Sequence, residues 1–222
     1  MDRPPSVIHG NDADVLTVLF ALHAPPQPRI LDVTYGRGVM WKRMPVQPWR
    51  NDIAPTLEAD SHHDFRYLPA DWAGRFDVVV FDPPHITEVG QNARLAKANP
   101  YGLHDQHGQP VRMVDIAPLF PAFLAEAKRV LAPGGLVFAK LKDGVHRSRF
   151  RWLSHDFKVA AEQVGFTCCA PLLKVDPHAG RIVGANWATV DHPRTQHTWW
   201  MVLHNGVHCV ARRNRHNGRV HV

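Results

Sequence analysis

Apolar residues recur along the chain in two patterns, one typical of helices and one of buried strands. Apolar side chains at positions 15, 16, 18, 19 and 22 follow a helical repeat after a polar segment, residues 11–14, that offers N-cap residues. This pattern predicts a first helix that ends near Ala24, before two prolines. Residues 77–81 instead form a short run rich in β-branched side chains, which favours a buried strand.

The same two patterns continue to residue 203 and predict the fold class. Helical spacing returns at 116–131 and 154–164, and glycines follow both segments. Strands and helices alternate until two strands follow one another, which predicts an α/β domain with a mostly parallel sheet and a C-terminal antiparallel hairpin. The seven strand candidates lie at 29–34, around 49–52, around 62–69, and at 77–81, 136–141, 166–175 and 198–203.

Length and composition favour one soluble domain. With 222 residues and 45% hydrophobic content, the chain can bury one core, so a single domain over 1–222 is expected. Two polar segments, 86–115 and 176–197, are predicted to be inserted loops, and 212–222 forms a basic tail. The apolar stretches are too short to cross a bilayer and the first residues do not resemble a signal peptide, so a cytoplasmic location is expected.

A glycine turn follows the strand predicted at 29–34. Its residues are Tyr35, Gly36, Arg37 and Gly38. Glycines permit positive φ angles and close approach of the backbone to a ligand, which favours a nucleotide-like cofactor. A dinucleotide fingerprint would need a third glycine where Trp41 stands, so a nicotinamide cofactor is disfavoured.

The strand predicted at 77–81 ends in a rigid corner, Asp82-Pro83-Pro84-His85. Proline fixes its own φ and restrains the preceding residue, so the Asp82 carboxylate and the Pro83 carbonyl become two fixed acceptors beside the ring of His85. Two acceptors can hold both N–H bonds of an exocyclic amino group and turn its lone pair toward an electrophile. Taken alone, the corner is more often a turn that merely ends a strand, so the rest of the chain has to decide between the two interpretations.

Together, the corner and the glycine turn resemble a known family. Asp82 to His85 resembles the (D/N/S)PP(Y/F/W) motif of S-adenosylmethionine-dependent amino-methyltransferases of nucleic acids, with His85 in place of the usual aromatic residue. The acid and glycines before it are similar to the cofactor motif of class I methyltransferases. The resemblance implies a Rossmann-like, seven-stranded class I methyltransferase fold and is greatest to small phage and bacterial DNA methylases.

The resemblance also implies roles for individual residues. Asp52 would bind the cofactor ribose, although a helix cap before residues 53–55 is an equally good interpretation, and Asp64 and Phe65 would meet the adenine. The catalytic residues implied are Asp82, Pro83, Pro84 and His85. The cofactor-binding residues implied are Asp32, Thr34, Tyr35, Gly36, Gly38, Asp52, Asp64 and Phe65.

The net charge of the chain suggests a polyanionic partner, whereas its histidines and cysteines suggest no bound metal. A formal charge of +6 and a pI near 9.5 favour a polyanion, although a solvated basic surface explains them as well. The 16 histidines and three cysteines show no metal-ligand spacing, so no metal site is predicted. The predicted nucleic-acid contacts are Tyr101, Arg147, Arg149, Arg151, Arg181 and Arg194.

The leading interpretation is a DNA methyltransferase that acts on an exocyclic amino group, with adenine N6 preferred over cytosine N4. An RNA methyltransferase with the same chemistry and an inactive nucleic-acid-binding protein of the same fold remain alternatives. A small-molecule methyltransferase is disfavoured by the basic loops and by the Asp-Pro-Pro corner.

Overall fold

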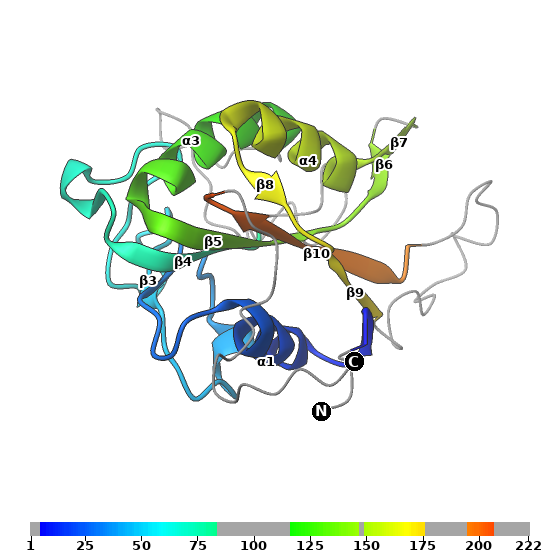
Figure 1. Ribbon diagram of the computed structural model, residues 1–222, viewed down its shortest axis with the longest axis horizontal. Coiled ribbons are helices and arrows are strands. Elements are labelled where there is room, and N and C mark those ends of the chain that lie inside the picture. The colour runs from blue at the N-terminus through cyan, green and yellow to red at the C-terminus, as the bar shows by residue number, and fades with distance from the viewer. Residues whose placement is uncertain (1–4, 84–115, 147–148, 176–194, 207–222) are drawn as a thin grey trace, which may run out of the picture.

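An eight-stranded sheet forms the centre of the computed structural model, which describes residues 5–83, 116–146, 149–175 and 195–206 (Figure 1). The strand order is β1-β9-β10-β5-β4-β2-β3, and β8 pairs with β10. The strands are β1 (Val7–His9), β2 (Ile30–Asp32), β3 (Trp49–Arg50), β4 (Phe76–Phe81), β5 (Leu131–Leu141), β8 (Thr167–Cys168), β9 (Leu172–Val175) and β10 (His197–His204).

Within this sheet, β10 is the one described strand that runs against the others. It pairs antiparallel with β5, β8 and β9, whereas the pairs β1–β9, β2–β3, β2–β4 and β4–β5 are parallel. The predicted fold class, a mostly parallel sheet with an antiparallel pair at its C-terminal end, is therefore confirmed.

Helices cover both faces of the sheet, with α1 (Asp12–His23) on one face and α3 (Phe120–Val130) and α4 (Leu153–Val164) on the other (Figure 1). Successive residues of a strand point to opposite faces, so β4 contributes to two cores. Val79 and Phe81 belong to the cluster that contains residues of α3 and α4, and Val78 and Val80 to the cluster that contains residues of α1. Burial on both faces explains why residues 78–81 are all apolar.

The predicted helices are confirmed together with the residues that end them. Asn11 caps α1 and forms a capping box with Asp14. Pro118 lies in the short 3-10 helix η3 (Ala117–Leu119) and Pro121 in the first turn of α3, where a missing N–H costs little. Gly165 follows α4 with a φ of 88°, which a residue with a side chain rarely adopts.

Four features differ from the elements predicted. The strand expected around 62–69 is absent, because the Asp64 carbonyl accepts the Tyr67 N–H at 2.8 Å and closes a turn. The strand expected at 166–175 is divided into β8 and β9, with Pro171 between them. β5 begins at Leu131, before the strand predicted at 136–141, but its pairing with β4 is irregular over residues 132–135, because the register shifts between the pairs Phe76–Leu131 and Val78–Leu136. β1 was not predicted, because three residues are too few to show an alternating pattern.

A second, two-stranded sheet was also not predicted; it consists of β6 (Gly144–His146) and β7 (Arg149–Arg151). The predicted insert 86–115, the tail 212–222 and most of the insert 176–197 lie outside the described residues. In the part of the chain that the structure describes, no helix has the length and apolar character needed to span a membrane.

Candidate cofactor and substrate site

The order of the sheet reverses between β2 and β4, because β3 lies beside β2 on one side and β4 on the other. In open α/β sheets, ligands bind beyond the carboxyl ends of strands at such a reversal. A cavity of about 280 Å³ lies at this position. The residues that line it come from the turn after β2, the loop after β3, the corner after β4, the first turn of α1 and the end of β5.

The turn after β2 depends on two glycines with left-handed backbone angles. Gly36 has a φ of 58° and Gly38 a φ of 61°. A β-carbon at Gly38 would also overlap the ring of Tyr35, which lines the cavity. A β-carbon at Gly36 would have the Thr34 carbonyl oxygen as its nearest neighbour, at 3.9 Å. The positive φ angles therefore favour glycine at both positions. Steric overlap with Tyr35 disfavours a side chain only at position 38.

Asp32 lies behind this turn and does not line the cavity. Its side chain is fully buried and accepts hydrogen bonds from the Thr34 N–H at 3.0 Å and the Trp41 indole N–H at 2.6 Å. Burial raises the pKa of Asp32 to about 7, against the opposing effect of these two hydrogen bonds. Asp32, which was predicted to bind the cofactor, instead holds the turn in place.

Trp41 occupies the position where a dinucleotide fingerprint would have its third glycine. It belongs to the 3-10 helix η1 (Val39–Trp41), and its buried ring fills the space under the turn. Between the turn and β3 the described chain forms only this short 3-10 helix, so no α-helix N-terminus faces the cavity there.

Asp52 lines the cavity from the loop after β3. One carboxylate oxygen accepts the Gly36 N–H at 2.8 Å and the other accepts the Ala54 N–H at 2.9 Å. The described residues 53–69 contain no helix, so Asp52 is not a helix cap. Its carboxylate connects the loop after β3 to the glycine turn and is only 8% exposed.

Asp64 and Phe65, which were predicted to act together, are separated by the structure. Phe65 lines the cavity and packs edge-to-face on Phe81, with ring centroids 5.3 Å apart. Asp64 does not line the cavity, and both of its carboxylate oxygens accept hydrogen bonds from the Arg66 guanidinium. Burial would raise the pKa of Asp64, but the hydrogen bonds from Arg66 outweigh it and lower the pKa.

The corner after β4 meets the glycine turn directly. The Asp82 N–H donates to the Thr34 hydroxyl at 2.8 Å, and the Asp82 side chain lines the cavity. Pro83 is buried next to it, and Pro84 and His85 lie outside the described residues. The structure therefore brings Asp82, Thr34 and the predicted glycine turn into one site.

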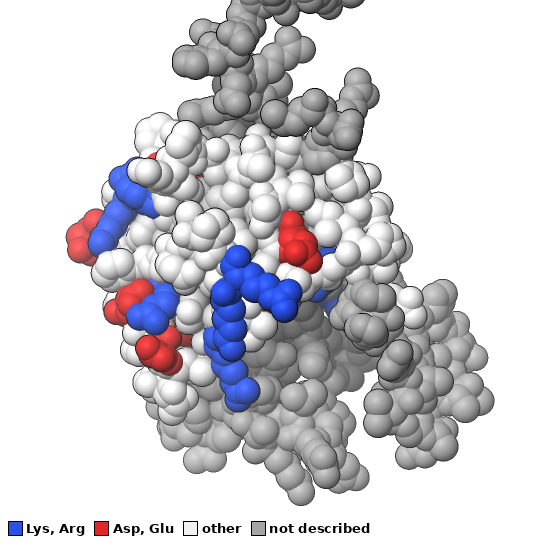
Figure 2. All heavy atoms as spheres, turned by 90° about the horizontal axis from the view of Figure 1, so that it is seen from below, with Lys and Arg blue, Asp and Glu red and all other residues white. Residues whose placement is uncertain are grey.

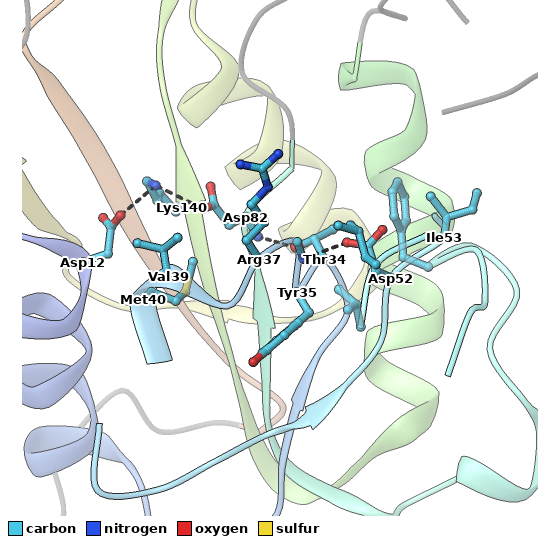
Figure 3. Close-up of a pocket in the computed structure, with 14 residues that line it drawn as sticks. Asp12, Thr34, Tyr35, Arg37, Val39, Met40, Asp52, Ile53, Asp82 and Lys140 are labelled. Carbon is cyan, nitrogen blue, oxygen red and sulfur yellow. Dashed lines mark hydrogen bonds and ion pairs between the residues drawn. The ribbon is translucent and has the colours of Figure 1, made fainter. Parts of the chain in front are cut away.

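Lys140 lies between two carboxylates at one end of this cavity (Figure 3). Its ammonium nitrogen is 3.0 Å from an oxygen of Asp82 and 3.0 Å from an oxygen of Asp12. The other oxygen of Asp12 is 2.8 Å from the ammonium of Lys174. We call these residues the ion-pair chain. Burial would lower the pKa of Lys140, but the two carboxylates outweigh it and raise the pKa, so Lys140 stays charged.

Sequence reasoning missed Asp12 and Lys140. Asp12 stands among the N-cap candidates, but the structure uses Asn11 and Asp14 for the cap and leaves Asp12 to the lysines. Lys140 is the one charged residue in the run 136–141. A charge near the end of an otherwise apolar strand was the signal that could have revealed it.

The predicted nucleic-acid contacts are only partly described. Arg149 is exposed on β7, and Arg151 lies 3.2 Å from Asp156. Tyr101, Arg147, Arg181 and Arg194 lie outside the described residues. On the face shown in Figure 2 most of the described surface is uncharged, and at one edge basic side chains lie against acidic ones. The positive net charge is therefore not concentrated on the described part of that face.

Several solved structures resemble this one. The complex between the Trm112 methyltransferase activator and a proposed methyltransferase from Haloferax volcanii matches 88% of this chain and 90% of that one, with 16% identity and a TM-score of 0.52. A proposed sarcosine dimethylglycine methyltransferase from Galdieria sulphuraria matches 87% of this chain and 83% of that one, with 13% identity and a TM-score of 0.50. The chain has the Rossmann-like fold of the class I methyltransferases.

A further structure with the methyltransferase fold holds a cofactor. It is a proposed DNA modification methylase from Thermus thermophilus in complex with S-adenosyl-L-methionine, which matches 81% of this chain with 17% identity and a TM-score of 0.41. This chain spans about half of that protein, 56% of its length. No protein-family model and no curated protein matches the sequence.

Proposed function

We propose that this methyltransferase fold transfers a methyl group from S-adenosylmethionine to an exocyclic amino group of a base in DNA, with adenine N6 preferred over cytosine N4. The observation that carries the proposal is the position of Asp82, which ends β4 and lines the same cavity as the glycine turn. A fixed acceptor and a cofactor site thus share one cavity. The choice of DNA and of adenine rests on the resemblance of the Asp-Pro-Pro-His corner.

The residues of the cavity fit the proposed cofactor. The glycine turn leaves room for a ligand to approach the backbone, and its conformation excludes side chains at positions 36 and 38. Asp52 offers a carboxylate to ribose hydroxyls, and Phe65 with Ile53 offers an apolar wall for a purine. When bound, S-adenosylmethionine supplies an electrophilic methyl group.

The chain itself prepares the amino group of the base. That nitrogen is a poor nucleophile while its lone pair is delocalised into the ring. Asp82 accepts one N–H bond of the amino group, and the Pro83 carbonyl accepts the other, so the lone pair turns out of the ring plane. In a duplex the base has to leave the stack to reach this corner.

Lys140 decides how Asp82 acts. A carboxylate beside an ammonium keeps its charge and its orientation, but it becomes a weaker base. The 3.0 Å contact between Lys140 and Asp82 therefore favours a role for Asp82 as an oriented acceptor, which takes the proton only after the new C–N bond has formed.

The first experiment identifies the polymer and the base. The protein is incubated with radiolabelled S-adenosylmethionine and separate DNA and RNA pools, and the products are digested to nucleosides. We expect labelled N6-methyladenine from DNA. Label in RNA alone would favour the RNA alternative, and cofactor binding without transfer to either polymer would favour an inactive binding protein.

The second experiment tests Asp82. Asp82→Ala should reduce methyl transfer on the order of 100-fold or more, as for other preorganised polar groups, while affinity for the demethylated cofactor stays close to normal. Asp71→Ala, which removes an exposed carboxylate in the 3-10 helix η2 (Ala70–Trp72), is the matched control. Wild-type turnover in Asp82→Ala would overturn the proposed chemistry.

A further inference from the structure

The β6–β7 hairpin extends from the edge of the sheet where the cavity lies. β5 runs parallel to β4 and pairs Ala139 with Phe81, so the two strands reach their carboxyl ends side by side. β6 begins three residues after β5 ends, and it pairs antiparallel with β7. The hairpin therefore leaves the sheet at the edge that carries Asp82, and it is seen there beyond α4 in Figure 1.

Asp143 anchors the base of this hairpin. Its side chain is buried, with 1% exposure, and accepts hydrogen bonds from the Ser154 N–H at 2.9 Å, the Ser154 hydroxyl at 2.8 Å and the Trp199 indole N–H at 3.0 Å. Trp152, at the N-cap of α4, provides no capping side chain, so Asp143 satisfies that helix end from outside. The hairpin is thereby tied to both α4 and β10.

Two aromatic rings are exposed where the hairpin leads into α4, one on β7 and one at the N-cap of that helix. Phe150 is 41% exposed and Trp152 is 60% exposed, and their ring centroids lie 5.0 Å apart in an edge-to-face arrangement. Arg149 precedes Phe150 on β7 and is also exposed, and no ion pair joins Arg149 to an acid among the described residues. Two exposed rings and an exposed cation on one short segment are features of surfaces that bind single-stranded nucleic acid.

We propose that Phe150 and Trp152 form a stacking platform for an unpaired base of the nucleic-acid strand, and that Arg149 contacts a phosphate of that strand. The inference rests on the proposed function, because it names the part of the substrate that the site holds outside the reacting base. The occupant is a nucleic-acid strand because an exposed arginine complements a phosphate, and because the hairpin leaves the same sheet edge as Asp82.

Binding measurements separate the rings from the cation. Phe150→Ala and Trp152→Ala should each weaken binding of a single-stranded oligonucleotide on the order of 10-fold, and Trp152→Phe should retain most of the affinity. Neither ring variant should change the slope of log affinity against log salt, whereas Arg149→Ala should reduce the magnitude of that slope by about 0.7. Tyr67→Ala, which removes another exposed ring beside an arginine, is the matched control.

A fluorescent base locates the stacking. A series of oligonucleotides is prepared, each with a single 2-aminopurine at a different position. On binding, the fluorescence of one of them should be quenched, and Trp152→Ala should remove that quenching. Unchanged affinity in both ring variants, or a loss equal to that of Tyr67→Ala, would overturn the proposal. Both readouts measure binding alone, so they can fail while Asp82-dependent methyl transfer succeeds, and they can succeed in a protein that transfers no methyl group.

Discussion

Lys140 connects the Asp82 corner to the first helix. The side chains of Lys140, Asp82 and Asp12 are between 13% and 21% exposed, so their charges are poorly screened by solvent. Removal of one member of such a group leaves the others without compensation, which costs more than the loss of a surface ion pair. Under the proposed function, Lys140 is a positioning residue, because it contacts Asp82 and would act on the substrate only through it.

We predict that Lys140→Met shifts the acidic limb of the pH–activity profile toward higher pH. A carboxylate that loses a neighbouring cation, and keeps other acids nearby, ionises at a higher pH. Among the described residues, the charged groups near Asp82 include Asp12 on α1, Asp32 on β2, Arg37 in the glycine turn and Lys174 of β9, which contacts Asp12. The measurement is kcat/KM for methyl transfer between pH 5 and pH 9.

Lys140→Arg provides the control, because it keeps the charge and should restore most of the profile. A merely structural lysine would lower activity equally at every pH. A Lys140→Met enzyme that folds and keeps the wild-type pH dependence would therefore contradict the positioning role while leaving Asp82 as the acceptor.

Among the residues that line the cavity, sequence reasoning predicted those that lie close together in the chain. Asp82 and the Gly36–Gly38 turn follow strands and carry their own turn residues, so short spacings reveal them. The ion-pair chain joins residues 12, 82, 140 and 174, and no spacing rule relates them. Asp32 and Asp64 were placed in the site because of their sequence positions, but partners such as Trp41 and Arg66 take their carboxylates.

Among the elements, the glycine turn after β2 makes the strictest demand on its sequence. Gly38 and Gly74 both have a positive φ, 61° and 66°, but their surroundings differ. A β-carbon at Gly74 would meet nothing within 4 Å, whereas one at Gly38 would displace the ring of Tyr35. The two glycines therefore form a matched pair for separating backbone strain from damage to the cavity.

We predict that Gly38→Ala and Gly74→Ala each lose about 1–2 kcal/mol of unfolding free energy, because alanine tolerates the left-handed conformation poorly. Only Gly38→Ala should also weaken binding of the demethylated cofactor, by at least about 10-fold, because Tyr35 lines the cavity. Chemical denaturation and calorimetry measure the two effects. Equal cofactor affinity in both folded variants would show that the cofactor does not bind against this turn.

The long elements were predicted, and several of the shortest were not. α1, α3 and α4 each span at least 11 residues, and their apolar spacing and end residues agree. β1, β6 and β7 have three residues each, too few to show an alternating pattern, and β1 is defined by its pairing with the distant strand β9. The strand around 62–69 shows the reverse case: it was predicted but does not form, because a local turn closes there.

At the scale of the whole molecule, Asp32 should give stability an unusual dependence on pH. Its pKa is about 7 in the folded protein and near the ordinary value of 3.8 in the unfolded chain. Below pH 3.8 both states are protonated at this group, so it has no effect. Between these values the unfolded state releases the proton first, so stability falls as pH rises, by at most about 1.4 kcal/mol per pH unit.

Comparison with Asp32→Asn isolates this effect from other carboxylates. An asparagine satisfies only one of the two donors and does not titrate, so its own effect on stability is the same at every pH. The unfolding free energy of wild type minus that of the variant should therefore fall from pH 4 to pH 7 and stay constant above pH 8. A difference that is independent of pH, measured by urea denaturation, would show that Asp32 is ionised in the fold throughout this range.

The strand order of the sheet has a consequence during synthesis. β9 lies between β1 and β10, so β10 is its one described link to the central strands β5, β4 and β2. Residues 197–204 of β10 have to be synthesised before this link can form, whereas Asp82 and Lys140 come earlier in the chain. The edge of the sheet that carries Lys174 is therefore the last part to pair with the centre of the sheet during translation.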